Sequence, residues 1–150
     1  MRIARLLPGL PGRGVLLAAP ADADRVRRTL ADSGFALAAV TGDGAGMREA
    51  QSAIARALRL PGTAGRNLDA MVDSLRDLAT WWPEDERVAL LWLGAEKLVD
   101  ADLPGFLTLT GILRAATDDL WRGGRPGDRH FETVAFVSGH GVPALRDVPT

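Results

Sequence analysis

Three aspartates at intervals of four residues form the most unusual chemical pattern in this sequence. If residues 68–79 are helical, Asp69, Asp73 and Asp77 stand one above another on one face. The helix gains little from them, because aspartate is a poor helix former and like charges at this spacing repel by about 0.2–0.5 kcal/mol per pair. Only Asp69 stands in the first turn, where the helix dipole favours a carboxylate. The stripe therefore indicates either a solvated face with local ion pairs or a surface kept negative for a cationic partner.

A turn and an amphipathic helix are predicted to position this stripe. Residues 61–65 contain Pro, Gly and Thr and form the turn, and Asn67 can cap the following helix through its side-chain oxygen. Arg66 and Arg76 stand near enough to offset part of the negative charge. The apolar residues at helical spacing on another face are Leu68, Met71, Val72, Leu75, Leu78 and Ala79. We therefore expect the helix to pack one face on a core and to expose the acidic one.

The same segment resembles the signature of the barstar family. The residues that carry the resemblance are Leu60-Pro61, a short glycine-containing turn, and then Gly65-x-Asn67-Leu68-Asp69-Ala70-x-x-Asp73-x-Leu75. Barstars are small intracellular inhibitors of secreted guanyl-specific ribonucleases such as barnase. In that family the turn and the second helix plug the active site of the ribonuclease, so the resemblance implies that Asp69 and Asp73 meet cationic residues there. A weaker resemblance extends from about Phe35 to about Val137.

Three positions depart from the family pattern. A tyrosine is expected in the turn near Thr63 and is missing, and the whole chain contains no tyrosine. Val72 replaces the aromatic residue before the second aspartate, and Ala115 replaces an acidic residue on a later helix. The charges of the motif are kept, while aromatic side chains, which are common interface anchors, are missing.

The resemblance implies a partner-binding surface and leaves two kinds of partner open. The residues of this surface are Thr63, Gly65, Arg66, Asn67, Asp69, Val72, Asp73 and Asp77. One partner is a small ribonuclease with a cationic active site, which the chain would inhibit. The other is a different basic protein, bound by an adaptor or regulator with the same fold. In both cases we expect the free chain to be a monomer.

Composition excludes several other functions. A chain of 150 residues suits one domain with a sizeable core. The net charge of −1 gives no overall attraction to nucleic acid, so no direct nucleic-acid partner is expected. The absence of cysteine excludes disulfides and thiolate metal sites. No apolar run is long enough to span a membrane, and the glycines and prolines of residues 8–14 interrupt a signal-like N-terminus. We therefore expect a cytoplasmic protein.

The sequence shows no constellation for catalysis, so we expect no enzyme, no metal and no cofactor. His130 and His140 have no partner at metal-ligand spacing, and neither a nucleophile elbow nor a phosphate-binding loop of the Gly-Lys-Ser/Thr type is present. Asp69 and Asp73 could be a pair of catalytic carboxylates in a hydrolase. That reading is disfavoured, because no apolar wall that would raise one pKa is evident.

Strands that alternate with helices predict an α/β domain with a barstar-like, small parallel sheet packed with helices. Core strands are expected at residues 35–41, 87–93 and 131–137, and an additional N-terminal strand at 14–19. Helices are expected at about 22–33, 47–60, 67–81 and 104–121. Trp81 and Trp82 end the third helix and are interpreted as packing residues, with an interface edge as the alternative.

The predicted organisation has three parts. Residues 1–34 are an N-terminal extension, with an irregular arm up to residue 13 and then an extra strand-helix unit. Residues 35–138 form the barstar-like domain, and residues 139–150 a poorly ordered tail. The glycine-rich turn at 42–46 lacks the third small residue of a dinucleotide loop, so we interpret it as structural.

Overall fold

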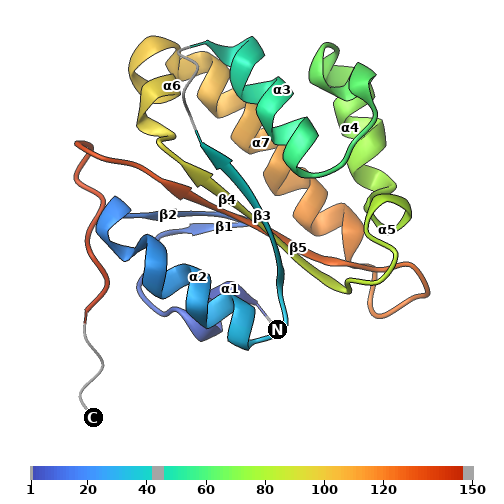
Figure 1. Ribbon diagram of the computed structural model, residues 1–150, viewed down its shortest axis with the longest axis horizontal. Coiled ribbons are helices and arrows are strands. Elements are labelled where there is room, and N and C mark those ends of the chain that lie inside the picture. The colour runs from blue at the N-terminus through green and yellow to red at the C-terminus, as the bar shows by residue number, and fades with distance from the viewer. Residues whose placement is uncertain (1, 42–45, 147–150) are drawn as a thin grey trace.

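The computed structural model describes residues 2–41 and 46–146 and shows one five-stranded sheet with helices on both faces (Figure 1). The strands are β1 (Gly12–Arg13), β2 (Val15–Ala18), β3 (Ala36–Thr41), β4 (Arg87–Leu93) and β5 (His130–Phe136). The helices are α1 (Ile3–Leu6), α2 (Ala23–Asp32), α3 (Met47–Ala57), α4 (Leu68–Arg76), α5 (Leu78–Trp81), α6 (Glu96–Ala101) and α7 (Leu103–Leu120). Two short 3-10 turns are η1 (Pro20–Asp22) and η2 (Gly62–Gly65). Apart from Gly46, the predicted glycine-rich turn at 42–46 lies outside the described residues.

Four strands of the sheet run parallel, which confirms the predicted α/β fold with three core strands and an additional N-terminal strand. The order is β1-β2-β5-β4-β3, so β4 lies between β3 and β5. The residues of β4 from Val88 to Trp92 are all buried, as its near-continuous apolar sequence predicts for a parallel strand covered on both faces. Strand β2 pairs with β5 along its whole length, so the N-terminal segment extends the same sheet.

Two apolar cores lie on the two faces of the sheet. Helices α3, α4 and α7 cover the first face, and α1 and α2 cover the second (Figure 1). Buried residues of the second core include Leu16, Val26, Leu30, Leu91, Val134 and Phe136. Half of these precede residue 34 and half belong to β4 and β5. The N-terminal segment therefore supplies the cover for one face of the sheet.

The first residues differ from the predicted irregular arm. Residues 3–6 form α1, and β1 pairs antiparallel with β2, which the sequence did not indicate. The backbone N–H of Ile3 donates to Oε1 of Glu132 on β5 at 3.0 Å, and the Ile3 side chain is fully buried. This contact joins residues that are 129 positions apart, so no local pattern could predict it.

Residues 139–146, predicted as part of a poorly ordered tail, make polar contacts with the domain. Nε2 of His140 lies 2.8 Å from Oδ1 of Asp100 on α6. The backbone N–H of Leu145 donates to Oδ2 of Asp22 at 2.8 Å. None of the helices that residues 2–41 and 46–146 form is long and apolar enough to cross a bilayer.

Glu132→Gln is expected to reduce the dependence of stability on pH. Burial raises the pKa of Glu132, against the opposing effects of the Ile3 N–H and the charge of Arg2. A raised pKa means that the folded state holds the proton more tightly, so this stabilisation is largest below pH 4.5 and is lost as the pH rises through the folded pKa. The free energy of unfolding of the variant, relative to that of the wild type, should therefore be higher at pH 8 than at pH 5. A difference that does not change with pH would contradict this assignment.

Asp128 organises the loop between α7 and β5. Its buried carboxylate accepts backbone N–H bonds from Arg122, Gly124 and Arg125 at 2.8–2.9 Å, and one from Nε of Arg122 at 3.1 Å. Burial alone would raise the pKa of Asp128, but these hydrogen bonds outweigh it and lower the pKa to about 2. The sequence predicted a loop here without this central acceptor.

Asp128→Ala is expected to lower the melting temperature at neutral pH, because three backbone donors lose their acceptor. A lowered pKa stabilises the fold above the unfolded value of 3.8, and this contribution disappears as the pH falls toward about 2. Melting curves of variant and wild type should therefore converge between pH 4 and pH 2. Equal separation of the two curves at both ends of that range would contradict the assignment.

Candidate functional site

The turn before α4 is fixed on α3 by packing within the chain. Buried Gln51 on α3 donates from Nε2 to the carbonyl of Ala64 at 3.0 Å. A Cβ atom at Gly65 would lie 3.2 Å from Cα of Ser52, so a side chain there would push η2 away from α3. Gly65 thus allows the turn to pack closely on α3. The spacing of the motif alone does not reveal this role.

Helix α4 begins at the cap that the sequence predicts. Oδ1 of Asn67 accepts the backbone N–H of Ala70 at 2.9 Å, and Met71 and Leu75 are buried beneath the helix. Of the eight predicted partner-binding residues, six are exposed, namely Thr63, Arg66, Asn67, Asp69, Asp73 and Asp77. Gly65 and Val72 are partly buried. The site is therefore an exposed surface that runs from η2 along α4, on a helix that is capped and packed on the core.

Two carboxylates of the stripe are exposed on α4. The side chain of Asp73 is 78% exposed, and its Oδ1 lies 3.8 Å from Nη1 of Arg76. Asp69 is exposed in the first turn, where the helix dipole favours its charge. An exposed ion pair of this length contributes at most about 1 kcal/mol to stability. The fold thus depends little on either carboxylate.

Asp77 departs from the predicted stripe. A single helix through residue 81 was expected, but α4 ends at Arg76 and Asp77 occupies the turn before α5. The indole N–H of Trp81 donates to the carbonyl of Ser74 at 2.9 Å and so satisfies a backbone acceptor at the end of α4. The prediction of a continuous helix is wrong at this residue, because a side chain from the next turn takes the place of a helical hydrogen bond.

Both tryptophans after α4 pack within the chain, as interpreted from the sequence. Trp82 is buried and donates from Nε1 to the carbonyl of Leu58 at 2.8 Å. The guanidinium of Arg59 lies 3.7 Å from the centre of the Trp82 ring, in cation–π geometry. These contacts fix the C-terminal end of α3 to the segment after α5.

A further carboxylate joins the acidic surface from α7. Oδ2 of exposed Asp119 lies 3.8 Å from Nε of Arg76, so Arg76 stands between Asp119 and Asp73. Asp119 follows Ala115 by one helical turn, on the helix where the resemblance expects an acidic residue. Sequence reasoning did not identify Asp119. Its position one helical turn after Ala115 could have identified it.

A groove of about 310 Å³ runs between α4 and α7 beside this surface. The residues that line it are Val72, Leu75, Arg76, Leu107, Thr108, Gly111, Ile112, Ala115, Ala116 and Asp119. Val72 and Ala115 are the two helical positions where the family pattern has larger side chains. The structure therefore brings two distant departures from the pattern into one groove.

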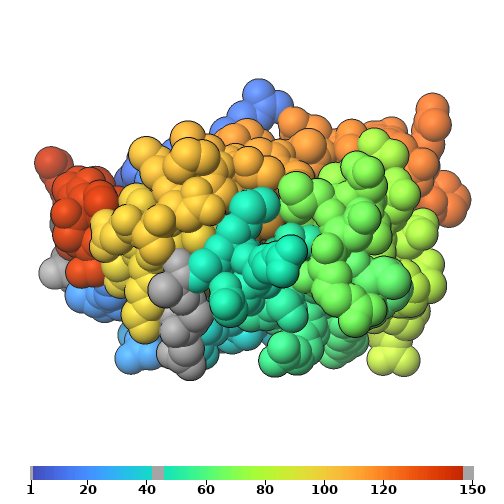
Figure 2. Space-filling view, turned by 90° about the horizontal axis from the view of Figure 1, so that it is seen from above, coloured from blue at the N-terminus to red at the C-terminus, as the bar shows by residue number. Residues whose placement is uncertain are grey.

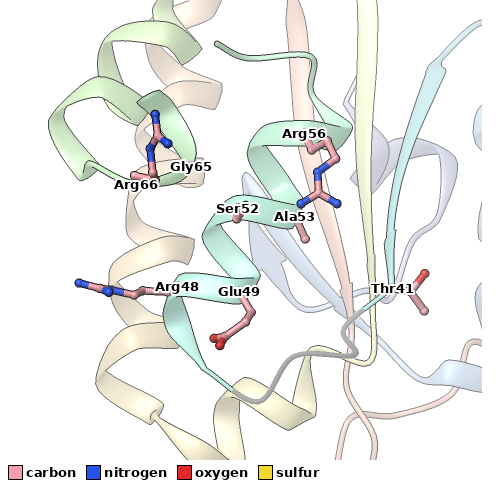
Figure 3. A pocket seen from close by; sticks show the side chains of 8 residues that line it. All are labelled: Thr41, Arg48, Glu49, Ser52, Ala53, Arg56, Gly65 and Arg66. Carbon is pink, nitrogen blue, oxygen red and sulfur yellow. The ribbon is translucent and has the colours of Figure 1, made fainter. Parts of the chain in front are cut away.

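A second hollow, of about 830 Å³, lies beside α3 and the end of η2 (Figure 3). It is lined by Thr41, Arg48, Glu49, Ser52, Ala53, Arg56, Gly65 and Arg66. In Figure 3 the three arginine side chains point in different directions and do not converge on one point. Figure 2 shows α3 and the segment from η2 to α5 as neighbours on the same face of the molecule. A basic region thus adjoins the acidic one.

The histidines make local contacts. The ring of His130 stacks on Trp121, with 3.9 Å between the ring centres. Burial lowers the pKa of His130, and the charges of Arg87 and Arg2 act in the same direction. Among the described residues, no group of three or more His, Asp or Glu side chains is placed to hold a metal ion.

The arrangement around α4 offers charge and shape for binding another molecule.

A protein-family model matches the part of the chain that contains η2, α4 and α7. The model of the family described as Barstar (barnase inhibitor) matches residues 36–137, which is more than half of the chain. This segment includes η2, α4 and α7. Comparisons with curated proteins and with solved structures gave no match. The chain therefore belongs to the barstar family.

Proposed function

We propose that this chain inhibits a small ribonuclease by laying the acidic face of α4 over the cationic active site of the enzyme. The single observation that carries the proposal is the exposure of Asp73. Its side chain is 78% exposed, and the stability of α4 depends little on it. Asp69 and Asp119 extend the negative surface on both sides of it. The membership of the chain in a family of barnase inhibitors supplies the class of partner.

The proposed mechanism is mimicry of the substrate phosphate. Ribonucleases that cleave RNA must bind phosphate, and arginine, lysine and protonated histidine do so through charge-assisted hydrogen bonds. Carboxylates at Asp69 and Asp73 would accept the same hydrogen bonds. The Asn67 cap and the buried residues under α4 hold them in place before the partner arrives, which reduces the entropy lost on binding.

The proposal includes the setting in which the inhibitor works. It would act in the cytoplasm, as a monomer when free, and protect the cell from an enzyme that is harmless only while it is bound. It would need no cofactor and would carry out no reaction. Nucleic acid would be excluded from the ribonuclease by the inhibitor and would not itself be a ligand of this chain.

A second candidate is an adaptor that binds a different basic protein. The observation that favours it is the loss of side-chain bulk at Thr63, Val72 and Ala115, three positions of the family pattern. The arginines of the neighbouring hollow also distinguish this face from a uniformly acidic one. An adaptor would bind its partner without affecting RNA cleavage, so an activity assay separates the two candidates.

Inhibition assays with a panel of small guanyl-specific ribonucleases test the proposed function. Each enzyme is titrated with the full chain while the cleavage of a fluorogenic RNA is followed. We expect at least one enzyme to lose its activity in proportion to the added chain, with an end point at one inhibitor per enzyme. Full activity of every enzyme at micromolar concentrations of the chain would contradict the proposal and favour the adaptor.

Arg66→Glu is expected to raise the association rate with a ribonuclease several-fold at low salt. Arg66 is exposed directly before the cap of α4, so its cation weakens the negative field of the site. Arg27→Glu on α2 changes the net charge equally but lies on the opposite face of the sheet. Stopped-flow measurements should show the larger increase for Arg66→Glu, and raising the salt should remove it. Equal rates for the two variants would contradict local steering.

A further inference from the structure

The groove between α4 and α7 is an apolar depression with small residues in its wall. Leu75 and Ala116 are buried at its base, and Val72 and Ile112 are partly buried along it. A Cβ atom at Gly111 would meet no heavy atom within 4 Å, so space is open at the middle of α7. The groove therefore has room for a group that the chain itself does not provide.

Exposed apolar surface continues beyond the groove. The side chain of Leu107 lines it and is 59% exposed, and Leu103 in the preceding turn of α7 is 50% exposed. These are two of the three large apolar side chains that the described residues expose. Together with the groove, these side chains extend the apolar surface along one edge of α7.

The groove is continuous with the proposed inhibitory surface. Val72 directly precedes Asp73 on α4, and Arg76 both lines the groove and pairs with Asp73. Asp119 forms part of the same edge. A partner that contacts both Asp73 and Asp119 would therefore cover the groove as well.

The charges around the groove decide which partner can occupy it. Asp73 and Asp119 are exposed beside it, and Arg76 lies between them. A second copy of this chain would bring its own aspartates against them, and like charges at an interface are unfavourable. A protein with cations beside an apolar projection complements both the charge and the shape.

We propose that the groove receives one large apolar side chain that projects from the partner beside its cationic site. This inference rests on the proposed function and specifies the kind of ribonuclease that the chain would recognise. The volume of about 310 Å³ is enough to admit one large apolar side chain. The aromatic anchor of the interface would thus come from the partner, and the inhibitor would supply the cavity.

A tryptophan scan of a small guanyl-specific ribonuclease tests this inference. Surface positions around its active site are replaced one at a time by tryptophan, and each enzyme is titrated with the full chain. We expect tryptophan at one or more positions to tighten binding at least tenfold. Ala115→Phe, which fills the groove, should abolish that gain. Ala31→Phe, at an exposed alanine of α2 on the opposite face, should retain it.

Gly111→Leu is a second filling variant that the fold should tolerate. Its Cβ enters open space, and leucine favours a helix more than glycine does. A cooperative melt confirms that each variant is folded before it is titrated. Loss of the tryptophan gain in Gly111→Leu as well as in Ala115→Phe would support the inference.

The failure of this inference can be distinguished from failure of the proposed function. If no tryptophan tightens binding, or if the groove-filled variants keep the gain, the inference is overturned. Binding that Asp73→Asn still weakens would then leave the proposed function in place. If neither the unmodified enzymes nor the tryptophan variants bind the chain, both proposals are overturned.

Discussion

Asp73→Asn is expected to weaken binding of a ribonuclease partner by about 2–5 kcal/mol, because the partner's cations would be buried against a neutral amide. The free energy of unfolding should change by no more than about 0.5 kcal/mol. The side chain is 78% exposed and its only ion pair in the described residues, to Arg76 at 3.8 Å, is solvated. Relief of repulsion from Asp69 offsets part of that loss. Calorimetric titration and a denaturant midpoint measure both quantities on one sample.

Asp32→Asn is the matched control for this experiment. Asp32 is an exposed aspartate at the end of α2, on the other face of the sheet from α4. Its replacement removes the same charge and should leave binding within twofold of wild type. If Asp73→Asn clearly loses stability but binds the partner as the wild type does, the predicted role in binding is wrong. Asp73 then has a structural role on a solvated surface.

Removal of residues 1–33 is expected to unfold the protein. The deletion exposes one face of β4 and β5, including Leu91 and Phe136. It also removes buried side chains of the N-terminal segment, among them Ile3, Leu16, Val26 and Leu30. At about 1.5–3 kcal/mol for each, these losses approach the entire stability of about 5–15 kcal/mol that is typical of a domain. The shortened chain should show no cooperative thermal transition by circular dichroism.

Two single substitutions in β2 refine this prediction. Leu16 is 1% exposed in the second core, whereas its neighbour Leu17 is only partly buried on the other face. Leu16→Ala should cost about 2–5 kcal/mol, and Leu17→Ala clearly less. A cooperative melt of the shortened chain near the wild-type temperature would show that residues 36–137, which match the family, fold without the N-terminal unit.

The sequence predicts those parts of the fold that depend on local patterns of residues. The apolar run of β4 and the Asn67 cap of α4 both appear in the structure as expected. Helix α1 and strand β1 could not be predicted, because Glu132 on β5 holds Ile3 from a distant part of the chain. The break at Asp77 depends on the indole of Trp81, whose orientation only tertiary packing defines.

The candidate site was predictable in its charges and less so in its shape. Asp69 and Asp73 were identified from their spacing and lie exposed on α4. Val72 and Ala115 were recognised as separate departures from a family pattern. Only the packing of α4 on α7 shows that they line one groove. Asp119 was missed for the same reason, since its relation to Arg76 joins two helices that are distant in sequence.

Competition between this chain and a guanosine mononucleotide for one ribonuclease tests the central claim most directly. The claim is that the carboxylates of α4 occupy the position of the substrate phosphate. It predicts that the apparent Kd of the complex rises in proportion to the concentration of mononucleotide, once that concentration exceeds the nucleotide's own Kd. An apparent Kd that stays constant at saturating mononucleotide would show that the chain binds elsewhere on the enzyme and would contradict the claim.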